Sequence, residues 1–246
     1  MSALAVFLVA IGIADICRRV STRRRPALVA GPAAVLVCAA LCGLWHLGDI
    51  VLLVGAAVAI VGWVLLCARA EHDSDHQIAP LTVFGAAVAV LGVLSGWPSP
   101  VGGLVGHWLP WVGLSGVDAT RGVLLLGVLL LQLVTGNQLV RLVLSSVGAV
   151  RPAGQPQPSD RLKGGRLLGP MERLLIVGLG LAGQLAAASA VIAAKSIIRF
   201  PELSAQRKDD GQPPPGSGID EVTEYFLVGS FASWIVAMAG LALTLP

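Results

Sequence analysis

Seven long apolar runs constrain the fold of this chain more than any other feature. A run of about 17 to 25 apolar residues is long enough to cross the hydrocarbon core of a bilayer as a helix. Only helices and closed barrels satisfy their backbone groups in lipid, and runs that are continuous rather than alternating exclude a barrel. The sequence therefore predicts an all-α polytopic membrane helix bundle of about seven transmembrane helices. They cover roughly residues 2–17, 27–45, 50–68, 78–97, 119–140, 171–195 and 222–244.

The composition supports the same class. Of the 246 residues, 55% are hydrophobic and only 13% are charged, and the mean hydropathy is +0.81. A soluble domain carries about 25% charged residues. The net charge is only +3, and clustered cations of this kind indicate membrane orientation, so we expect no nucleic-acid partner. The cysteines all lie in apolar runs, where we expect small core residues rather than disulfides or metal ligands: Cys17, Cys38, Cys42 and Cys67.

The segment 98–116 differs from the seven runs. It is rich in glycine and proline and contains Trp108 and Trp111, and Trp97 directly precedes it. Indole rings favour the headgroup region, where both the apolar ring and the polar N–H are satisfied. We therefore expect one interfacial or re-entrant segment here, in addition to the seven transmembrane helices.

Lysine and arginine set the predicted orientation. The loops after the first and fifth runs are the most basic: Arg18, Arg19, Arg23, Arg24 and Arg25 in the first, and Arg141, Arg151, Arg161, Lys163 and Arg166 in the second. The positive-inside rule assigns both loops to the cytoplasm, which predicts the N-terminus outside and the C-terminus in the cytoplasm. The loop 196–221 disagrees, because it would lie outside although it carries Arg199, Arg207 and Lys208. A true span over 98–116 would bring that loop inside, but it would move the cations of 141–169 outside.

This organisation predicts three parts. Residues 1–150 form an N-terminal membrane bundle of five spans, residues 151–169 a basic cytoplasmic linker, and residues 170–246 a C-terminal two-helix transmembrane hairpin. The linker is rich in proline, glycine and polar residues, as is the stretch 207–218.

The stretch LLIVGLGLAGQLAA, residues 174–187, contains a G-x-G-x-x-G motif at Gly178, Gly180 and Gly183. This spacing also occurs in dinucleotide-binding βαβ units, and Glu202 follows near the distance of a ribose-binding acid. Such a domain needs several βαβ units, and the chain around this stretch has no room for them. We therefore expect no nucleotide and no cofactor, and interpret the stretch as the middle of a membrane helix.

Small residues at spacing four support the helix interpretation. They are expected to form one stripe that packs against another helix or a partner protein: Gly178, Ala182, Ala186, Ala190 and Ala194. A matching series at Gly229, Ser233 and Ala237 predicts an antiparallel hairpin between the last two helices. A polar stripe runs beside the small one, because Arg173, Gln184 and Lys195 are eleven residues apart, which is close to three helical turns.

The C-terminal part resembles an uncharacterised family of bacterial multi-pass membrane proteins, defined as a domain of unknown function. The resemblance covers about residues 170–240. It rests on Glu172–Leu175, Gly183–Gln184, Ala193–Ile197 with Arg199–Phe200, Glu224–Tyr225, Gly229 and Ser233–Trp234. It implies a location in the bacterial plasma (inner) membrane, and it implies that one polar intramembrane set belongs together: Glu172, Arg173, Gln184, Lys195, Arg199, Glu224 and Tyr225.

Other polar residues give weaker signals. His72 and His76 could bind a metal, but a solvated turn explains them better, so no metal site is expected. His46 and Asp49 are expected to lie in a tight turn, with Asp49 as the N-cap of the following helix. No complete catalytic set can be assembled, so we expect a non-enzymatic scaffold or accessory subunit of a membrane complex. The alternative is a small-solute or ion transporter that uses a polar site around Gln184, Lys195 and Glu224.

Overall fold

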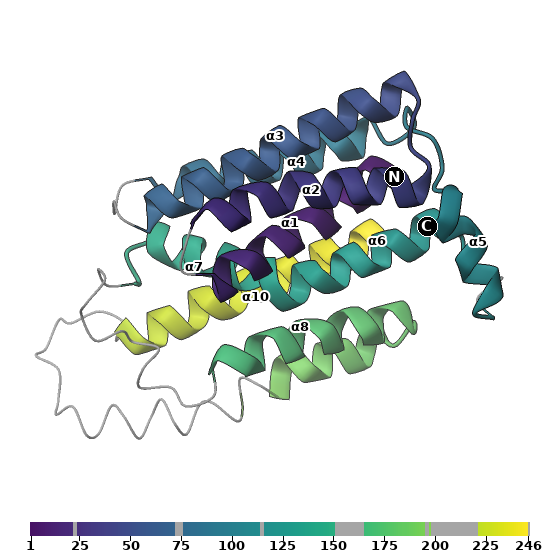
Figure 1. The fold of residues 1–246 in the computed structure, drawn as a ribbon. Coiled ribbons are helices and arrows are strands. Elements are labelled where there is room, and N and C mark those ends of the chain that lie inside the picture. The colour runs from purple at the N-terminus through teal and green to yellow at the C-terminus, as the bar shows by residue number, and fades with distance from the viewer. Residues whose placement is uncertain are drawn as a thin grey trace, which may run out of the picture. The chain divides into compact units, whose positions relative to one another are not determined.

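The computed structural model describes residues 1–21, 24–71, 76–113, 116–150, 165–194, 197 and 221–245 (Figure 1). These residues are predominantly helical, and none of them lies in a β-strand. The predicted all-α class is therefore confirmed. The chain forms two compact units, residues 1–135 and 136–246, which are described separately. Their boundary lies within the helical stretch Ala119–Ser146, earlier in the chain than residue 150.

Each unit consists of helices joined by short connections or by segments outside the described residues. The N-terminal unit contains α1 (Ser2–Val20), α2 (Arg24–Cys42), α3 (Leu47–Ala70), α4 (Ile78–Val93), α5 (Gly103–Trp111), α6 (Ala119–Leu130) and a π-helical turn, η1 (Leu131–Thr135). The C-terminal unit contains α7 (Gly136–Ser146), α8 (Gly165–Leu181), a helix over Leu185–Ala194 that we call the returning helix, and α10 (Glu221–Thr244).

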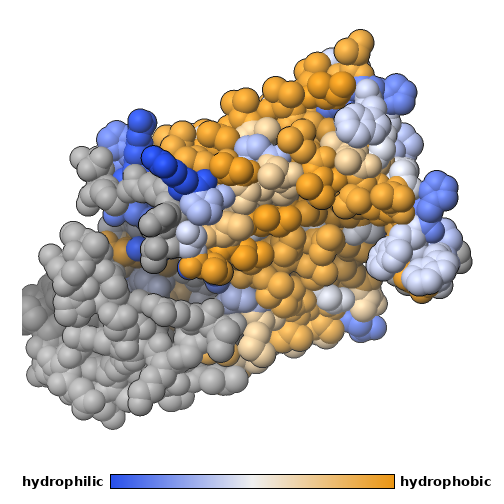
Figure 2. All heavy atoms as spheres, viewed as in Figure 1, coloured by the Kyte–Doolittle hydropathy of each residue, from blue (hydrophilic) through white to orange (hydrophobic). Residues whose placement is uncertain are grey.

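Four helices among the described residues are long and apolar enough to cross a membrane: Arg25–Cys42, Leu47–Ala70, Ala119–Ser146 and Thr223–Thr244. The surface agrees with this assignment, since Figure 2 shows hydrophobic side chains covering α2 and α3. Large apolar residues on these two helices are well exposed, among them Val29, Leu36, Val54 and Val58. A soluble protein rarely exposes a contiguous apolar surface of this kind, whereas lipid favours it.

α1 is the central helix of the N-terminal unit. Its residues 3–11 are at most 5% exposed, as expected for a helix that is apolar on all sides. Two glycines allow α6 to approach it closely. A Cβ on Gly12 would lie 2.8 Å from Cβ of Leu130, and one on Gly127 would lie 2.8 Å from Cβ of Leu8. Close packing through small residues, which the sequence predicted for the C-terminal helices, therefore also occurs between α1 and α6.

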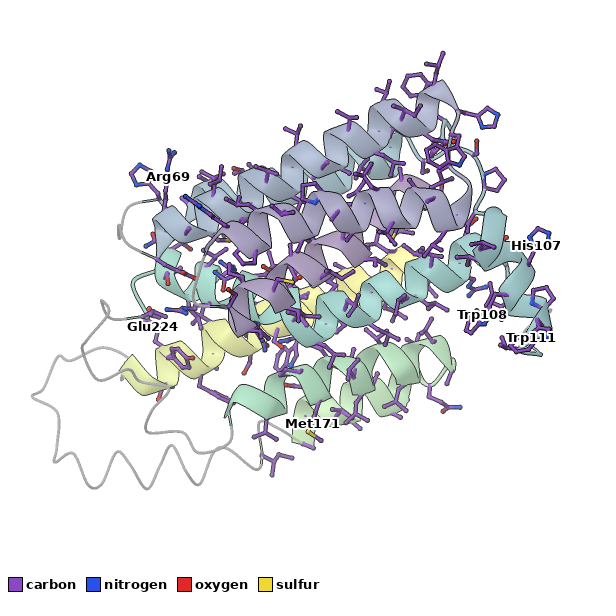
Figure 3. The ribbon with its side chains drawn as sticks, in the orientation of Figure 1. Arg69, His107, Trp108, Trp111, Met171 and Glu224 are labelled. Carbon is purple, nitrogen blue, oxygen red and sulfur yellow. The ribbon has the colours of Figure 1, made fainter. Side chains whose placement is uncertain are left out.

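The segment 98–116 contains one short helix, α5, of nine residues. At 1.5 Å per residue this helix is about 13 Å long, less than half of a hydrocarbon core of about 30 Å. Trp97, Trp108 and Trp111 are 62%, 56% and 82% exposed. Figure 3 shows Trp108 and Trp111 on α5, at one end of the helices of this unit.

The expected continuous helix over 171–195 is wrong. α8 ends at Leu181, three residues form a turn, and the returning helix begins at Leu185. Figure 1 shows α8 and the returning helix as two green ribbons that run back alongside each other. A connection this short is typical of antiparallel neighbours.

Glycine explains why the helix breaks here. The N–H of Gly183 donates to the carbonyl oxygen of Gly180 at 3.0 Å, and the N–H of Gln184 donates to that of Leu179 at 2.8 Å. These two bonds form a Schellman motif, which needs a left-handed residue just after the helix. Gly183 has φ +73°, a conformation that costs glycine little. The last glycine of the G-x-G-x-x-G motif therefore ends a helix.

α8 and α10 are parallel, so the predicted antiparallel hairpin is also wrong. Arg173, in the middle of α8, bonds to Ser233 in α10. Gly180, at the end of α8, lies against Leu241, further along α10. Contacts that advance in the same direction on both helices require a parallel course. The reason is the turn at Gly183, because the returning helix brings the chain back before α10 begins.

α7 runs in the opposite direction to α10. A Cβ on Gly229, near the start of α10, would lie 3.5 Å from Cδ1 of Leu144, near the end of α7. At the other end of α7, Asn137 accepts a hydrogen bond from Arg173, which also bonds to Ser233. The C-terminal unit is thus built on α10, with α7 antiparallel and α8 parallel to it.

Candidate functional site

The structure brings together only part of the predicted polar set. Glu172 and Arg173 are buried between helices, at 7% and 1% exposure. Gln184 is exposed in the turn after α8, Glu224 is exposed in the first turn of α10, and Tyr225 is half-buried beside it. Lys195 and Arg199 lie outside the described residues.

Glu172 and Arg173 belong to a network that we call the interhelical clamp. The indole N–H of Trp234 donates to Oε1 of Glu172 at 2.7 Å. Arg173 donates from Nη1 to Oγ of Ser233 at 3.1 Å, and from Nη2 to Oδ1 of Asn137. The clamp therefore joins α7, α8 and α10 through side chains alone. Arg173 and Ser233 were predicted from their spacing, and Glu172 from the family resemblance. The sequence left open whether Asn137 is interfacial or bonds across helices, and the structure shows that it bonds across helices.

The clamp uses its polar groups to hold helices together. Polar side chains in an apolar region are costly unless they are hydrogen-bonded, and each of these contacts satisfies a group on two different helices. A guanidinium carries five donors in a fixed fork, which allows Arg173 to reach Asn137 and Ser233 at the same time. The geometry fits a structural role, in which these side chains hold α7, α8 and α10 together.

Gln184 and Glu224 lie far apart in the C-terminal unit. Gln184 follows Gly180, which lies against Leu241 of α10. Seventeen residues of helix separate Leu241 from Glu224, which corresponds to about 25 Å. The polar stripe predicted from residues eleven apart also fails, because the chain turns at Gly183. The structure therefore does not assemble one site from Gln184 and Glu224.

The small-residue stripe is corrected in the same way. Gly178 lies on α8, Ala182 in the turn, and Ala186 and Ala190 on the returning helix, so they do not form one stripe along one helix. A Cβ on Gly178 would meet no atom within 4 Å. Gly180, not Gly178, is the glycine of α8 that packs against α10. All five residues of the predicted stripe are exposed, including Ala194 at the end of the returning helix.

Metal ligands do not gather in the described part of the chain, where no group of three His, Cys, Asp or Glu side chains is placed to hold a metal ion. His72 lies outside the described residues, and His76 is exposed. The four cysteines, all within the described residues, form no disulfide; Cys42 and Cys67 are buried and Cys17 and Cys38 half-buried.

A second polar cluster, which the sequence did not reveal, surrounds Asp15 in the N-terminal unit. We call it the buried acid site. The carboxyl group of Asp15 is fully buried, and its Oδ1 accepts a hydrogen bond from Nε1 of Trp63 at 3.1 Å. Nη2 of Arg18 lies 3.3 Å from the same oxygen. Nη1 of Arg18 lies 3.4 Å from Oε1 of Glu71, so Arg18 connects the buried carboxyl to an exposed one.

The π-helical turn η1 forms the other wall of the buried acid site. Gln132 and Thr135 are fully buried in this turn, and the hydroxyl group of Thr135 is a neighbour of the Asp15 carboxyl group. π-Helical turns displace the regular backbone bonds and are frequent at functional sites. Arg19 donates to the carbonyl oxygen of Val134 at 2.7 Å, which satisfies one carbonyl of this turn. The available signal was two polar residues, Gln132 and Thr135, at the end of the leucine-rich stretch 123–135.

Asp49 is equally buried but lies in different surroundings. Its Oδ1 accepts the backbone N–H of Ser99 at 2.7 Å, and its Oδ2 accepts that of His46 at 3.1 Å. Both oxygens are therefore satisfied by backbone donors. His46, not Asp49, occupies the N-cap of α3, so the predicted N-cap position of Asp49 is wrong. Asp49 lies three residues later, at the third helical position, where its side chain accepts the backbone N–H of the N-cap residue and so still caps the helix.

An open apolar groove of about 230 Å³ also lies on the N-terminal unit, lined by Pro32, Ala57, Val58 and Val61. These side chains offer no polar group that would hold a polar solute.

Comparisons with family models, curated proteins and solved structures found no match to the chain.

Proposed function

We propose that this chain is an integral protein of the bacterial plasma membrane that acts as a non-enzymatic scaffold or accessory subunit of a membrane complex. The observation that carries the proposal is the interhelical clamp. Its buried polar side chains bond to one another across helices, as in a structural unit. The likeness of residues 170–240 to an uncharacterised membrane family is part of the same proposal.

The hairpin of α8 and the returning helix is the proposed docking element. Gly178, Ala182, Ala186 and Ala190 are exposed on it. Small side chains allow the backbone of another helix to approach closely, and this is a main source of helix association in lipid. The hairpin can also offer two helices to a partner at once, which a single stripe could not.

Purification in a gentle detergent tests the scaffold proposal. We expect a partner protein to co-purify in a fixed ratio and to be lost from the Ala186→Leu variant. The matched control is Leu185→Ala, which changes the neighbouring exposed position of the returning helix without adding bulk. Repeated purification of this chain alone, or equal retention of the partner by both variants, would contradict the proposal.

We further propose six membrane crossings with a re-entrant hairpin, in place of seven crossings. The six are α1, α2, α3, α4, the stretch Ala119–Ser146, and α10. The reversal at Gly183 supports this topology, because a hairpin returns the chain to the side from which it entered. The loop 196–221 then lies on the same side as the linker 151–169.

Charge favours this topology. With the N-terminus outside, both segments lie in the cytoplasm, and Arg199, Arg207 and Lys208 no longer conflict with the positive-inside rule. The last helix then crosses outward, so the C-terminus lies outside with the N-terminus rather than in the cytoplasm.

The transporter alternative makes a separate prediction. If Gln184, Lys195 and Glu224 formed a permeation site, Gln184→Ala and Lys195→Ala would abolish a solute flux into vesicles without affecting insertion. The distance of about 25 Å along α10 between the levels of Gln184 and Glu224 argues against such a site.

A further inference from the structure

Two carboxyl groups of the N-terminal unit are fully buried, and only one of them is satisfied. Asp49 has a backbone N–H on each oxygen. At Asp15, Trp63 and Arg18 both lie on Oδ1. Among the described residues, Oδ2 of Asp15 has no hydrogen-bond partner. A buried anionic oxygen without a donor is costly, and binding a proton removes that cost.

Thr135, the neighbour of Asp15 on η1, can form a hydrogen bond with the Asp15 carboxyl group in either of its protonation states. Thr135 is fully buried, its Oγ1 also has no hydrogen-bond partner in the described part of the chain, and it lies close enough to act on the carboxyl. A hydroxyl group can both donate and accept. It can therefore donate to the carboxylate, and it can accept from the protonated acid after a small rotation.

We propose that Asp15 is a proton-binding site, with Oδ2 as the atom that takes the proton and Thr135 as its partner. A proton passes from hydronium to Oδ2, an O–H bond forms, and a water molecule is released. The acid then donates to Oγ1 of Thr135. This inference goes beyond the scaffold function and does not depend on it.

The charged residues around Asp15 allow its carboxyl group both to bind and to release a proton. Arg18 lies within ion-pair distance of both Asp15 and Glu71, and its side chain is 16% exposed, so it links the buried carboxyl to the aqueous edge. When Asp15 is neutral, Glu71 still holds Arg18. Arg19 adds a second positive charge near Asp15 and is held by the carbonyl oxygen of Val134.

The other elements around α1 add few ionisable groups. α3 contributes Trp63 and, near its end, the buried Cys67, Arg69 and Glu71. η1 contributes the uncharged Gln132 and Thr135, and the one ionisable residue of α6 is Arg121 in its first turn. α4 contains no ionisable residue, and α2 contains only cysteines after the arginines of its first turn. Arginine keeps its proton, and Glu71 is exposed at the edge. Asp15 is thus the one fully buried carboxyl group among the described residues of this site.

Infrared difference spectroscopy of the full chain in lipid vesicles tests the proposal. Exposed carboxyl groups also bind protons on acidification, so the quantity measured is the difference between the acid-induced spectra of the wild type and of Asp15→Asn. This difference should contain the carbonyl band of one protonated carboxylic acid, and the band should shift in D₂O and on labelling with ¹³C-aspartate. Asp15→Asn should remove the band. Asp49→Asn, the matched control, should retain it, because both oxygens of Asp49 already have donors. Thr135→Val should shift its frequency.

Two results would overturn the proposal. They are the absence of a carboxylic band from this difference and a band that does not respond to ¹³C-aspartate. The labelling experiment uses the unsubstituted protein, so it decides whether the band belongs to an aspartate even if Asp15→Asn fails to fold.

Discussion

Arg173 donates a hydrogen bond to the hydroxyl oxygen of Ser233 at 3.1 Å, and this contact lies midway along two parallel helices. Gly180 lies against Leu241 eight residues further along α10. Two helices that follow one another in a chain are parallel only if the segment between them returns. The Schellman turn at Gly183 starts that return within a stretch that a hydropathy argument treats as one span.

Gly183→Ala distinguishes the turn from a continuous helix by the sign of its effect. In the middle of a helix, replacing glycine with alanine stabilises by about 1 kcal/mol. At φ +73° the added Cβ is strained, and we expect a loss of about 1 kcal/mol. Thermal unfolding in detergent, followed by circular dichroism, measures the difference. A raised melting temperature would show that residues 171–195 form one helix.

Gly180 and Gly178 form a matched pair on α8. Gly180→Leu should destabilise the C-terminal unit by about 1 to 3 kcal/mol, because any side chain there overlaps Leu241. Gly178→Leu should be close to neutral, because that position faces open space. Adding Leu241→Ala to Gly180→Leu should restore part of the stability. Equal effects of the two single substitutions would contradict the parallel packing of α8 on α10.

Arg173→Met should cost about 2 kcal/mol, because Asn137 and Ser233 lose a charged donor while they remain between helices. Arg141→Met is the control, since Arg141 is an exposed cation of the same unit. The comparison requires unfolding curves of both variants in one detergent. If both lost the same stability, the interhelical clamp would have no structural role.

Asp49→Ala should destabilise the N-terminal unit more than Asp118→Ala. Asp49 is fully buried and accepts two backbone N–H groups, from His46 and Ser99. Asp118 is exposed and accepts one, from Arg121 at 2.9 Å. Loss of a cap costs about 1 kcal/mol, and each buried donor left without a partner adds a similar amount. The reverse order of melting temperatures would be inconsistent with this account.

The sequence predicted what depends on hydropathy and length. The run 50–68 corresponds to α3 and the run 222–244 to α10, because a helix in lipid must be apolar over most of its length. It also predicted that the tryptophans near 98–116 lie at headgroup depth, and their exposure is compatible with that prediction. The sequence did not predict the features that depend on backbone conformation. Gly178, Gly180 and Gly183 are the same residue type, yet each has a different structural role. Space beside a glycine and the sign of its φ angle are tertiary properties.

The candidate sites show the same division. Arg173 was predicted from its spacing to Gln184 and Lys195, and Glu172 from the resemblance to an uncharacterised membrane family. Asp15 is a lone acid near the end of the first apolar run, and two of its neighbours, Trp63 and Thr135, are far away in the sequence. A π-helical turn has no sequence signature that would bring Thr135 to Asp15.

The side of the membrane on which the C-terminus lies tests the central claim most directly. Alkaline phosphatase, which is active only outside the cytoplasm, and green fluorescent protein, which fluoresces only inside it, are fused after Leu245. Fusions after residue 150 serve as the cytoplasmic control. The return of the chain at Gly183 predicts an active phosphatase and a dark fluorescent protein at Leu245. A fluorescent fusion without phosphatase activity would contradict it and would restore seven crossings.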